Sequence, residues 1–123
     1  MLIEFHRLIL GDSIRNERLL AALRHVIVPG ETTVADLGSG TGYLAFAARK
    51  LGAKRCWLYE TSDLLELSRT IAKANGIDGC TFVRADSRED VEPPRVDLVI
   101  SETLGNLALE EGALETLQDA RRF

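Results

Sequence analysis

A glycine-rich turn constrains this chain more than any other feature of its sequence. The stretch "VADLGSGTGYLAFAA" places Gly38, Gly40 and Gly42 between an apolar segment and an amphipathic one. Residue periodicity predicts a short buried strand over 33–37 and a helix over 43–51, so the glycines connect a strand to a helix. In such a turn the backbone amides can approach a ligand closely at the N-terminus of the helix. The chain is therefore expected to fold around a strand–loop–helix unit.

The rest of the chain alternates between strand-like and helix-like segments. Further strands are predicted over 55–59, 80–85 and 96–101, and further helices over 13–28, 61–76 and 109–121. Short apolar strands separated by helices indicate a parallel sheet with right-handed crossovers. We therefore predict an α/β fold, a Rossmann-like doubly wound and mainly parallel sheet of about four strands with flanking helices. The 123 residues are expected to form one domain, with an N-terminal helical segment over 1–30 and a core over 31–123.

The last predicted strand, "VDLVIS", shows almost no polar alternation. Such a run is typical of a strand that is buried on both faces and paired on both sides. The usual strand order of a doubly wound sheet nevertheless puts this strand at an edge. We therefore expect either an incomplete fold that belongs to a longer domain or a partner that covers the edge, for example in a homodimer.

Charge and composition restrict the classes of function. The net charge is −4 and the Lys and Arg residues are scattered, which argues against a nucleic-acid partner. Cys56 and Cys80 are far apart in the sequence, and each lies in a predicted buried strand. We therefore interpret them as core residues and expect no metal site. The opening "MLIEFHRLIL" lacks a signal cleavage site, and no apolar run is long enough to span a bilayer. We expect a cytoplasmic protein without a membrane partner.

The spacing of the glycines favours a particular class of ligand. A dinucleotide fingerprint, G-x-G-x-x-G, would place a small residue where Tyr43 stands. Alternating glycines preceded by the acidic Asp36 instead resemble motif I of class I S-adenosylmethionine-dependent methyltransferases. The resemblance implies that S-adenosylmethionine binds at this loop and leaves as S-adenosylhomocysteine (SAH). The alternative is a tight turn that needs glycine and binds nothing.

Acidic residues after two later strands support the same ligand. Glu60 ends the segment "RCWLYE", and open α/β sheets bind ligands at the carboxyl ends of their strands. Its carboxylate can accept hydrogen bonds from both ribose hydroxyls of a bound cofactor. A solvent-exposed strand end would also explain a glutamate at this position. Asp86, with Ser87 beside it, falls where many class I methyltransferases contact the adenine, although "ADSRED" would also suit a surface loop.

Three longer stretches narrow the resemblance. "HRLILGDSIRN", "LGAKRCWLYE" and "DLVISETLGNLALEEGAL" are similar to segments of the protein arginine methyltransferases, over nearly all of this chain but only the cofactor-binding half of such an enzyme. The resemblance implies that Arg15 binds the methionyl carboxylate of the cofactor, while the alternative is a surface ion pair with Asp12 or Glu17. It also implies that Glu102 and Glu111 hold a substrate guanidinium, which carboxylates bind bidentately.

The chain departs from this family at several positions. Thr103, Leu104 and Asn106 stand where the family has a Trp–Met pair and a tyrosine, and the C-terminal barrel of the family is absent from these residues. A nitrogen on a protein, either an amine or a guanidinium such as that of arginine, is the first expectation for the methyl acceptor, and a ribosomal protein or a small molecule is the second. A non-catalytic module that binds the cofactor or a partner chain is the alternative from another class. The predicted catalytic residues are Glu102 and Glu111. The predicted cofactor-binding residues are Arg15, Asp36, Gly38, Ser39, Gly40, Gly42, Glu60, Thr61, Asp86 and Ser87.

Overall fold

The computed structural model describes residues 13–101 and 113–123 of the chain. Its strands are β1 (Thr33–Leu37), β2 (Arg55–Tyr59), β3 (Cys80–Val83) and β4 (Leu98–Ser101). Its α-helices are α2 (Ser13–Val26), α3 (Tyr43–Lys50), α4 (Leu64–Ala74) and α5 (Ala113–Asp119), and its 3₁₀ turns are η1 (Ser87–Glu89) and η2 (Ala120–Arg122). The predicted α/β class is confirmed.

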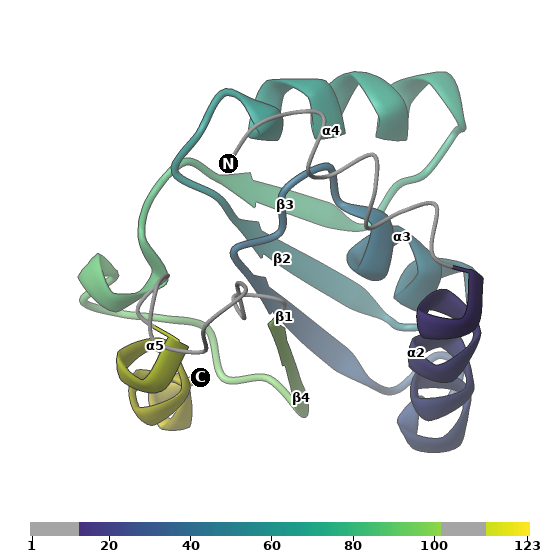
Figure 1. Ribbon diagram of the computed structural model, residues 1–123, viewed down its shortest axis with the longest axis horizontal. Helices are drawn as coiled ribbons and strands as arrows, with labels where there is room; N and C mark the ends of the chain where they lie inside the picture. Colours follow the sequence, from purple (N-terminus) through teal and green to yellow (C-terminus); the bar gives the residue numbers. More distant parts are fainter. Residues whose placement is uncertain (1–12, 102–112) are drawn as a thin grey trace.

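The strands form one parallel sheet in the order β3-β2-β1-β4 (Figure 1). β1 lies between β2 and β4, with Val34 opposite Cys56 on one side and opposite Leu98 on the other. From β1 the chain first adds strands on one side of the sheet and later returns to the other side. This arrangement creates a topological switch point next to β1, where open α/β sheets bind ligands at the carboxyl ends of their strands.

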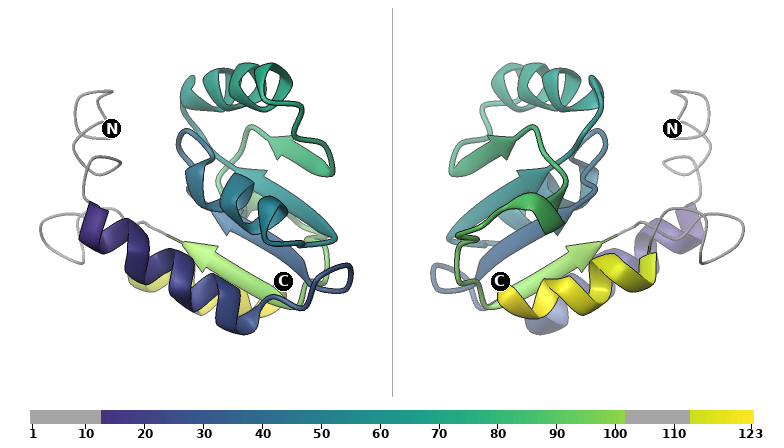
Figure 2. Two further views of the ribbon diagram at one scale, coloured as in Figure 1. Left: turned by 90° about the vertical axis from the view of Figure 1, so that its right-hand side faces the viewer. Right: turned by 90° about the vertical axis from the view of Figure 1, so that its left-hand side faces the viewer.

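Helices cover both faces of the sheet (Figure 2). On one face α2, α3 and α4 contribute Leu23, Phe46 and Leu65 to a single buried cluster. On the other face Phe123, which follows η2, packs against Tyr59 of β2. Because both faces are covered, β1 is buried from its second residue onwards, and this explains its lack of polar alternation.

The strand β4 lies at the edge of the sheet, as the sequence predicts. All its residues, Leu98–Ser101, are half-buried, and among the described strands it pairs with β1 alone. Its apolar run serves both faces, since Val99 packs on one face of the sheet and Ile100 on the other. The cover of its outer side, by the rest of a longer domain or by a partner, stays a prediction. Self-association through this edge stays a prediction, which sedimentation velocity tests.

Helix α4 begins later than the sequence predicts. The sequence predicts a helix over 61–76, whereas the helix spans Leu64–Ala74. The cause is a local hydrogen bond, because Ser62 N donates to Glu60 Oε2 at 2.9 Å and holds the chain in a bend before the helix. Ser62 Oγ still accepts from Leu64 N at 3.2 Å, so this serine contributes to the helix start from outside the helix.

The other boundaries lie close to the predicted ones. β1 and β2 have the predicted bounds, β3 ends at Val83, and β4 begins at Leu98. α4 is followed by a left-handed Gly76, with φ of 64°, as predicted. Cys80 is half-buried and not buried as predicted, because β3 is an edge strand. The start of the predicted helix over 109–121 lies outside the described residues. In the described part of the chain, every helix is too short or too polar to cross a membrane.

Candidate functional site

The glycine-rich loop lies at the carboxyl end of β1 and is tied to the end of β2. Gly38 N and Ser39 N both donate to Tyr59 O, at 2.8 and 2.9 Å. Gly38, Gly40 and Gly42 have positive φ angles of 74°, 58° and 89°. Residues with a side chain rarely adopt this conformation, so the predicted need for glycine in the loop is confirmed.

Gly42 also allows the closest packing in the loop. A Cβ atom at this position would lie 2.7 Å from the ring of Phe46 and 3.2 Å from Leu58 Cδ2. Phe46 and Leu58 are both buried in the core, so neither has room to move away. Glycine at this position therefore lets the N-terminus of α3 lie close to β2.

Glu60 follows β2 directly and joins two backbone segments through its carboxylate. Oε1 accepts from Gly40 N at 2.8 Å, and Oε2 accepts from Ser62 N at 2.9 Å. The side chain thus lies at the predicted strand end and holds the glycine loop beside the segment that follows β2. Glu60 also lines the cavity at this end of the sheet, and a carboxylate oxygen can accept more than one hydrogen bond.

Asp36 is buried beneath the loop, with only 2% of its surface exposed. Its Oδ2 atom and Ser39 Oγ have no hydrogen-bond partner among the described residues. Burial raises the pKa of Asp36 from 3.8 to about 7, a backbone hydrogen bond from Ala45 acts to lower it, and the charge of Glu60 raises it further. Unsatisfied buried polar groups are rare in native proteins and indicate that a ligand or water completes the site.

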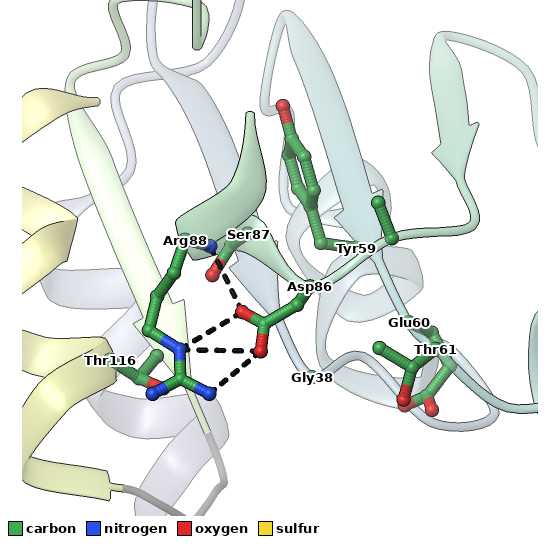
Figure 3. Close-up of a pocket in the computed structure, with 9 residues that line it drawn as sticks. Gly38, Tyr59, Glu60, Thr61, Asp86, Ser87, Arg88 and Thr116 are labelled. Atoms are coloured by element: carbon green, nitrogen blue, oxygen red, sulfur yellow. Dashed lines mark hydrogen bonds and ion pairs between the residues drawn. The ribbon is translucent and has the colours of Figure 1, made fainter. Parts of the chain in front are cut away.

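A cavity of about 130 Å³ opens at the carboxyl ends of the strands (Figure 3). It is lined by Gly38, Tyr59, Glu60, Thr61, Ala85, Asp86, Ser87, Arg88 and Thr116. Half of the predicted cofactor-binding residues thus come together from the loops after β1, β2 and β3. Pockets for whole small-molecule ligands measure about 300–1,000 Å³, so this cavity has the size for one part of such a ligand, such as an aromatic base.

The carboxylate of Asp86 is paired within its own turn. Arg88 Nη2 donates to Oδ2 at 2.7 Å, Arg88 Nε donates to both oxygens at 3.1 and 3.2 Å, and Arg88 N donates to Oδ1 at 2.9 Å. These hydrogen bonds lower the pKa of Asp86 below its ordinary value. Figure 3 shows the pair at the cavity. Asp86 therefore lines the cavity as predicted. Its carboxylate is ion-paired with Arg88 there, so it is not a lone hydrogen-bond acceptor for a ligand.

Several residues of the cavity were not predicted from the sequence. Tyr59 ends β2, and its Oη donates to Asp90 Oδ2 at 2.5 Å. The spacing of two between Asp86 and Arg88 could have indicated their local ion pair. Thr116 reaches the cavity from α5, far along the chain, and no local sequence pattern indicates such a long-range contact.

Other predicted site residues lie at or beyond the limits of the described structure. Arg15 belongs to the first turn of α2, and its side chain is not among the described ones. Glu102 and Glu111 fall outside the described residues. Residue 102 follows Ser101, whose Oγ donates to Leu37 O at 2.9 Å. The chain thus leaves β4 next to the end of β1, where the glycine loop begins.

A second and larger groove, of about 650 Å³, lies over α2, α3 and α4. Its walls are mostly apolar, with side chains such as Leu20, Phe46 and Ile71, and they include none of the predicted site residues. Within residues 13–101 and 113–123, no three His, Cys, Asp or Glu side chains gather to hold a metal ion. The smaller cavity at the carboxyl ends of the strands is therefore the candidate site.

The class of protein that carries this site follows from a family comparison. Residues 17–103 match the model of the methyltransferase small domain. The chain belongs to this methyltransferase family. The matching region includes the glycine loop, Glu60 and the turn at Asp86, so most of the candidate site lies within the part of the chain that matches the family.

Curated relatives of the methyltransferase domain have names that specify arginine. Protein arginine N-methyltransferase 9 of Xenopus laevis is 37% identical in an alignment 119 residues long that covers 92% of this chain and 14% of that protein. Arginine N(omega)-methyltransferase of Streptomyces achromogenes subsp. streptozoticus is 35% identical in an alignment 123 residues long that covers 95% of this chain and 34% of that protein. The chain thus spans 14% and 34% of the lengths of these relatives.

Solved structures share the fold of the methyltransferase domain. Protein arginine methyltransferase 10 of Arabidopsis thaliana superimposes with a TM-score of 0.85 at 26% identity, over 98% of this chain and 35% of that one. PRMT6 with SAH gives a TM-score of 0.83 at 26% identity, over 98% of this chain and 40% of that one. The predicted resemblance to the cofactor-binding half of protein arginine methyltransferases is confirmed.

Proposed function

We propose that this methyltransferase domain binds S-adenosylmethionine across the carboxyl ends of β1 and β2 and methylates a nitrogen of an arginine side chain on a protein. The observation that carries the proposal is the hydrogen bond from Gly40 N to Glu60 Oε1, which joins the glycine loop to the acidic end of β2 beside the cavity. The arginine methyltransferase names of the relatives and the SAH in the PRMT6 structure support the same chemistry.

The residues at the loop fit the parts of this cofactor. Asp36 Oδ2 and Ser39 Oγ have hydrogen-bonding capacity that the polar amino-acid part of the cofactor can use. Arg15 would supply a positive charge for its carboxylate. Glu60, which lines the cavity at the end of β2, would accept hydrogen bonds from the two ribose hydroxyls. The cavity beside Asp86 would hold the adenine ring.

The acceptor site is assigned to Glu102 and Glu111. Residue 102 follows directly on Ser101, which is hydrogen-bonded to Leu37 O at the end of β1. A substrate held there would lie next to the glycine loop and hence next to the cofactor. Two carboxylates suit an arginine side chain, because a guanidinium is planar, permanently charged and binds carboxylates bidentately.

The chemical role of the protein is mainly one of positioning. When bound, S-adenosylmethionine supplies a methyl group on a positively charged sulfur. The transfer is an in-line displacement, so the chain must hold the acceptor nitrogen opposite the C–S bond that breaks. Glu102 and Glu111 would also draw the positive charge of the guanidinium towards its bound end and leave the attacking nitrogen more electron-rich.

A second candidate acceptor is arginine as a free amino acid. The Streptomyces relative is named for arginine, without the word protein, and this chain spans 34% of it. The guanidinium chemistry is the same for both acceptors, so the two glutamates are expected to act in either case. The two candidates differ in whether the backbone of the acceptor is part of a peptide.

Replacing Glu102 by Gln tests the proposed reaction. We expect Glu102→Gln to lower methyl transfer to an arginine-containing peptide roughly a hundredfold, because the amide removes the charge that orients the guanidinium. The affinity for SAH should change less than about twofold, which corresponds to less than about 0.5 kcal/mol. Transfer of a labelled methyl group and calorimetric titration with SAH measure the two quantities, and Glu31→Gln, at an exposed position, is the control.

The other outcomes separate the remaining hypotheses. Methylation of free arginine but not of peptides would favour the second acceptor. Binding of SAH by the unaltered protein, without transfer to any arginine acceptor, would favour a non-catalytic module. Loss of SAH affinity in Glu102→Gln would show that Glu102 has a structural role and contradict its assignment to the acceptor site.

A further inference from the structure

One guanidinium on η2 binds the backbone of the turn that forms a wall of the candidate cavity. Arg122 Nη1 donates to Asp90 O at 2.6 Å. Arg122 Nη2 donates to Ser87 O at 3.3 Å and to Arg88 O at 3.4 Å. Ser87 and Arg88 also line the cavity. The turn therefore contacts the cavity and Arg122 at the same time.

Arg122 is itself held in place by its neighbours. Its Nε donates to Asp119 Oδ1 at 2.8 Å and its Nη2 to Asp119 Oδ2 at 3.0 Å, so the guanidinium forms a bidentate pair. The next residue, Phe123, packs edge-on against the ring of Tyr59, with centroids 5.3 Å apart and an interplanar angle of 89°. The carboxylate of Asp90 accepts from the hydroxyl of the same Tyr59. Ionic and apolar contacts thus anchor η2 to this side of the sheet.

The internal contacts of the turn η1 are all short-range, and its ion pair between Asp86 and Arg88 joins residues only two positions apart. It spans Ser87–Glu89, with backbone hydrogen bonds from Glu89 N to Asp86 O at 2.9 Å and from Asp90 N to Ser87 O at 3.4 Å. A 3₁₀ turn of this length has little intrinsic stability, and the chain from 91 to 97 contains no helix or strand to support it. Its position therefore depends on partners from other elements.

We propose that Arg122 is a positioning residue for cofactor binding, which fixes η1 and thereby Asp86 and Arg88 at the cavity without touching the cofactor. The inference rests on the proposed cofactor site. Because the turn belongs to the wall assigned to the adenine ring, its displacement weakens the binding of the cofactor. The methyl-transfer step is expected to be unchanged once the site is saturated, since η1 lines the cavity assigned to the adenine ring and not the methyl group that is transferred.

The variant Arg122→Ala tests this role against its neighbour Arg121→Ala. We expect Arg122→Ala to raise the Kd for SAH roughly tenfold, which corresponds to about 1.4 kcal/mol, and to raise the KM for the cofactor in parallel, with kcat unchanged. Arg121 is exposed, and Arg121→Ala should bind SAH within about twofold of the unaltered protein. Arg122→Lys keeps the charge beside Asp119 but lacks the planar fork for several carbonyls, so its Kd should lie between the two.

Hydrogen exchange distinguishes a positioning role from general destabilisation. In Arg122→Ala the amides of residues 87–92 should exchange faster, while those of β1 and β2 exchange as in the unaltered protein. Faster exchange throughout the domain, or an unchanged Kd in Arg122→Ala, would overturn the inference. If Arg122→Ala does not fold, an unchanged Kd in Arg122→Lys would overturn it instead. Failure of the unaltered protein to bind SAH would contradict the proposed function itself, a result distinct from these.

Discussion

At the scale of single residues, the buried Asp36 makes the stability of the fold depend on pH. Its carboxyl lies beneath the glycine loop, and burial raises its pKa from 3.8 to about 7. In the unfolded chain the same group titrates near its ordinary value. Folding therefore binds a proton between about pH 4 and pH 7, and stability falls as the pH rises through this range.

The variant Asp36→Asn makes this dependence measurable. The free energy that Asp36 contributes is fully present below about pH 4 and is lost as the pH rises through about 7, whereas the amide does not titrate. We expect Asp36→Asn to become more stable relative to the unaltered protein, by an amount of the order of a few kcal/mol, between pH 4.5 and pH 7.5. Urea unfolding of both proteins at both pH values measures the difference. Parallel pH dependences would contradict the buried, proton-binding state of Asp36.

At the scale of elements, the connection from β1 to α3 depends on Gly42. Gly42→Ala places a methyl group 2.7 Å from the ring of Phe46 and forces alanine to adopt φ of 89°. We expect a loss of about 1–2 kcal/mol from the backbone and a further 1–3 kcal/mol or so from overpacking. Gly76→Ala, at φ of 64° and with nothing within 4 Å, is the matched control and should lose only the backbone part. Equal free energies of unfolding for the two variants would show that the packing is looser than described.

The elements also show which features local sequence can predict. The bounds of β1 and β2 follow from short, mainly apolar runs, which end before Gly38 and before Glu60. The start of α4 does not follow from its sequence, because Glu60 Oε2 accepts from Ser62 N and holds the chain in a bend before the helix. The apolar run of β4 leaves open what covers its outer side, because such a run looks the same at the centre of a sheet and at its edge.

The candidate site shows the same division between local and long-range contacts. The glycine loop and Glu60 lie where the order of strands and helices predicts them, at the carboxyl ends of β1 and β2. The pairing of Asp86 with Arg88 changes what that carboxylate offers to a ligand. The contribution of Thr116 requires the three-dimensional packing of α5 against the other elements. Sequence alone therefore predicts the location of the site better than the hydrogen bonds within it.

At the scale of the whole molecule, the ends of the first three strands, the turn η1 and the helix α5 meet at one cavity. β1 supplies the glycine loop, β2 supplies Glu60, β3 leads into η1, and η2 holds η1 through Arg122. The same fold occurs in protein arginine methyltransferase 10 of Arabidopsis thaliana over 98% of this chain. The central claim is that this cavity and loop bind S-adenosylmethionine with Glu60 as the ribose acceptor.

Calorimetric titration of the protein with SAH, with and without Glu60→Gln, tests this claim most directly. We predict one binding site in the unaltered protein. The Kd should be roughly tenfold higher in Glu60→Gln, because the amide removes the charged acceptor of the ribose hydroxyls. The control Glu66→Gln, at an exposed position of α4, should leave the Kd unchanged. An absence of binding heat from the unaltered protein at high micromolar SAH, or equal affinities in the unaltered protein and Glu60→Gln, would contradict the claim.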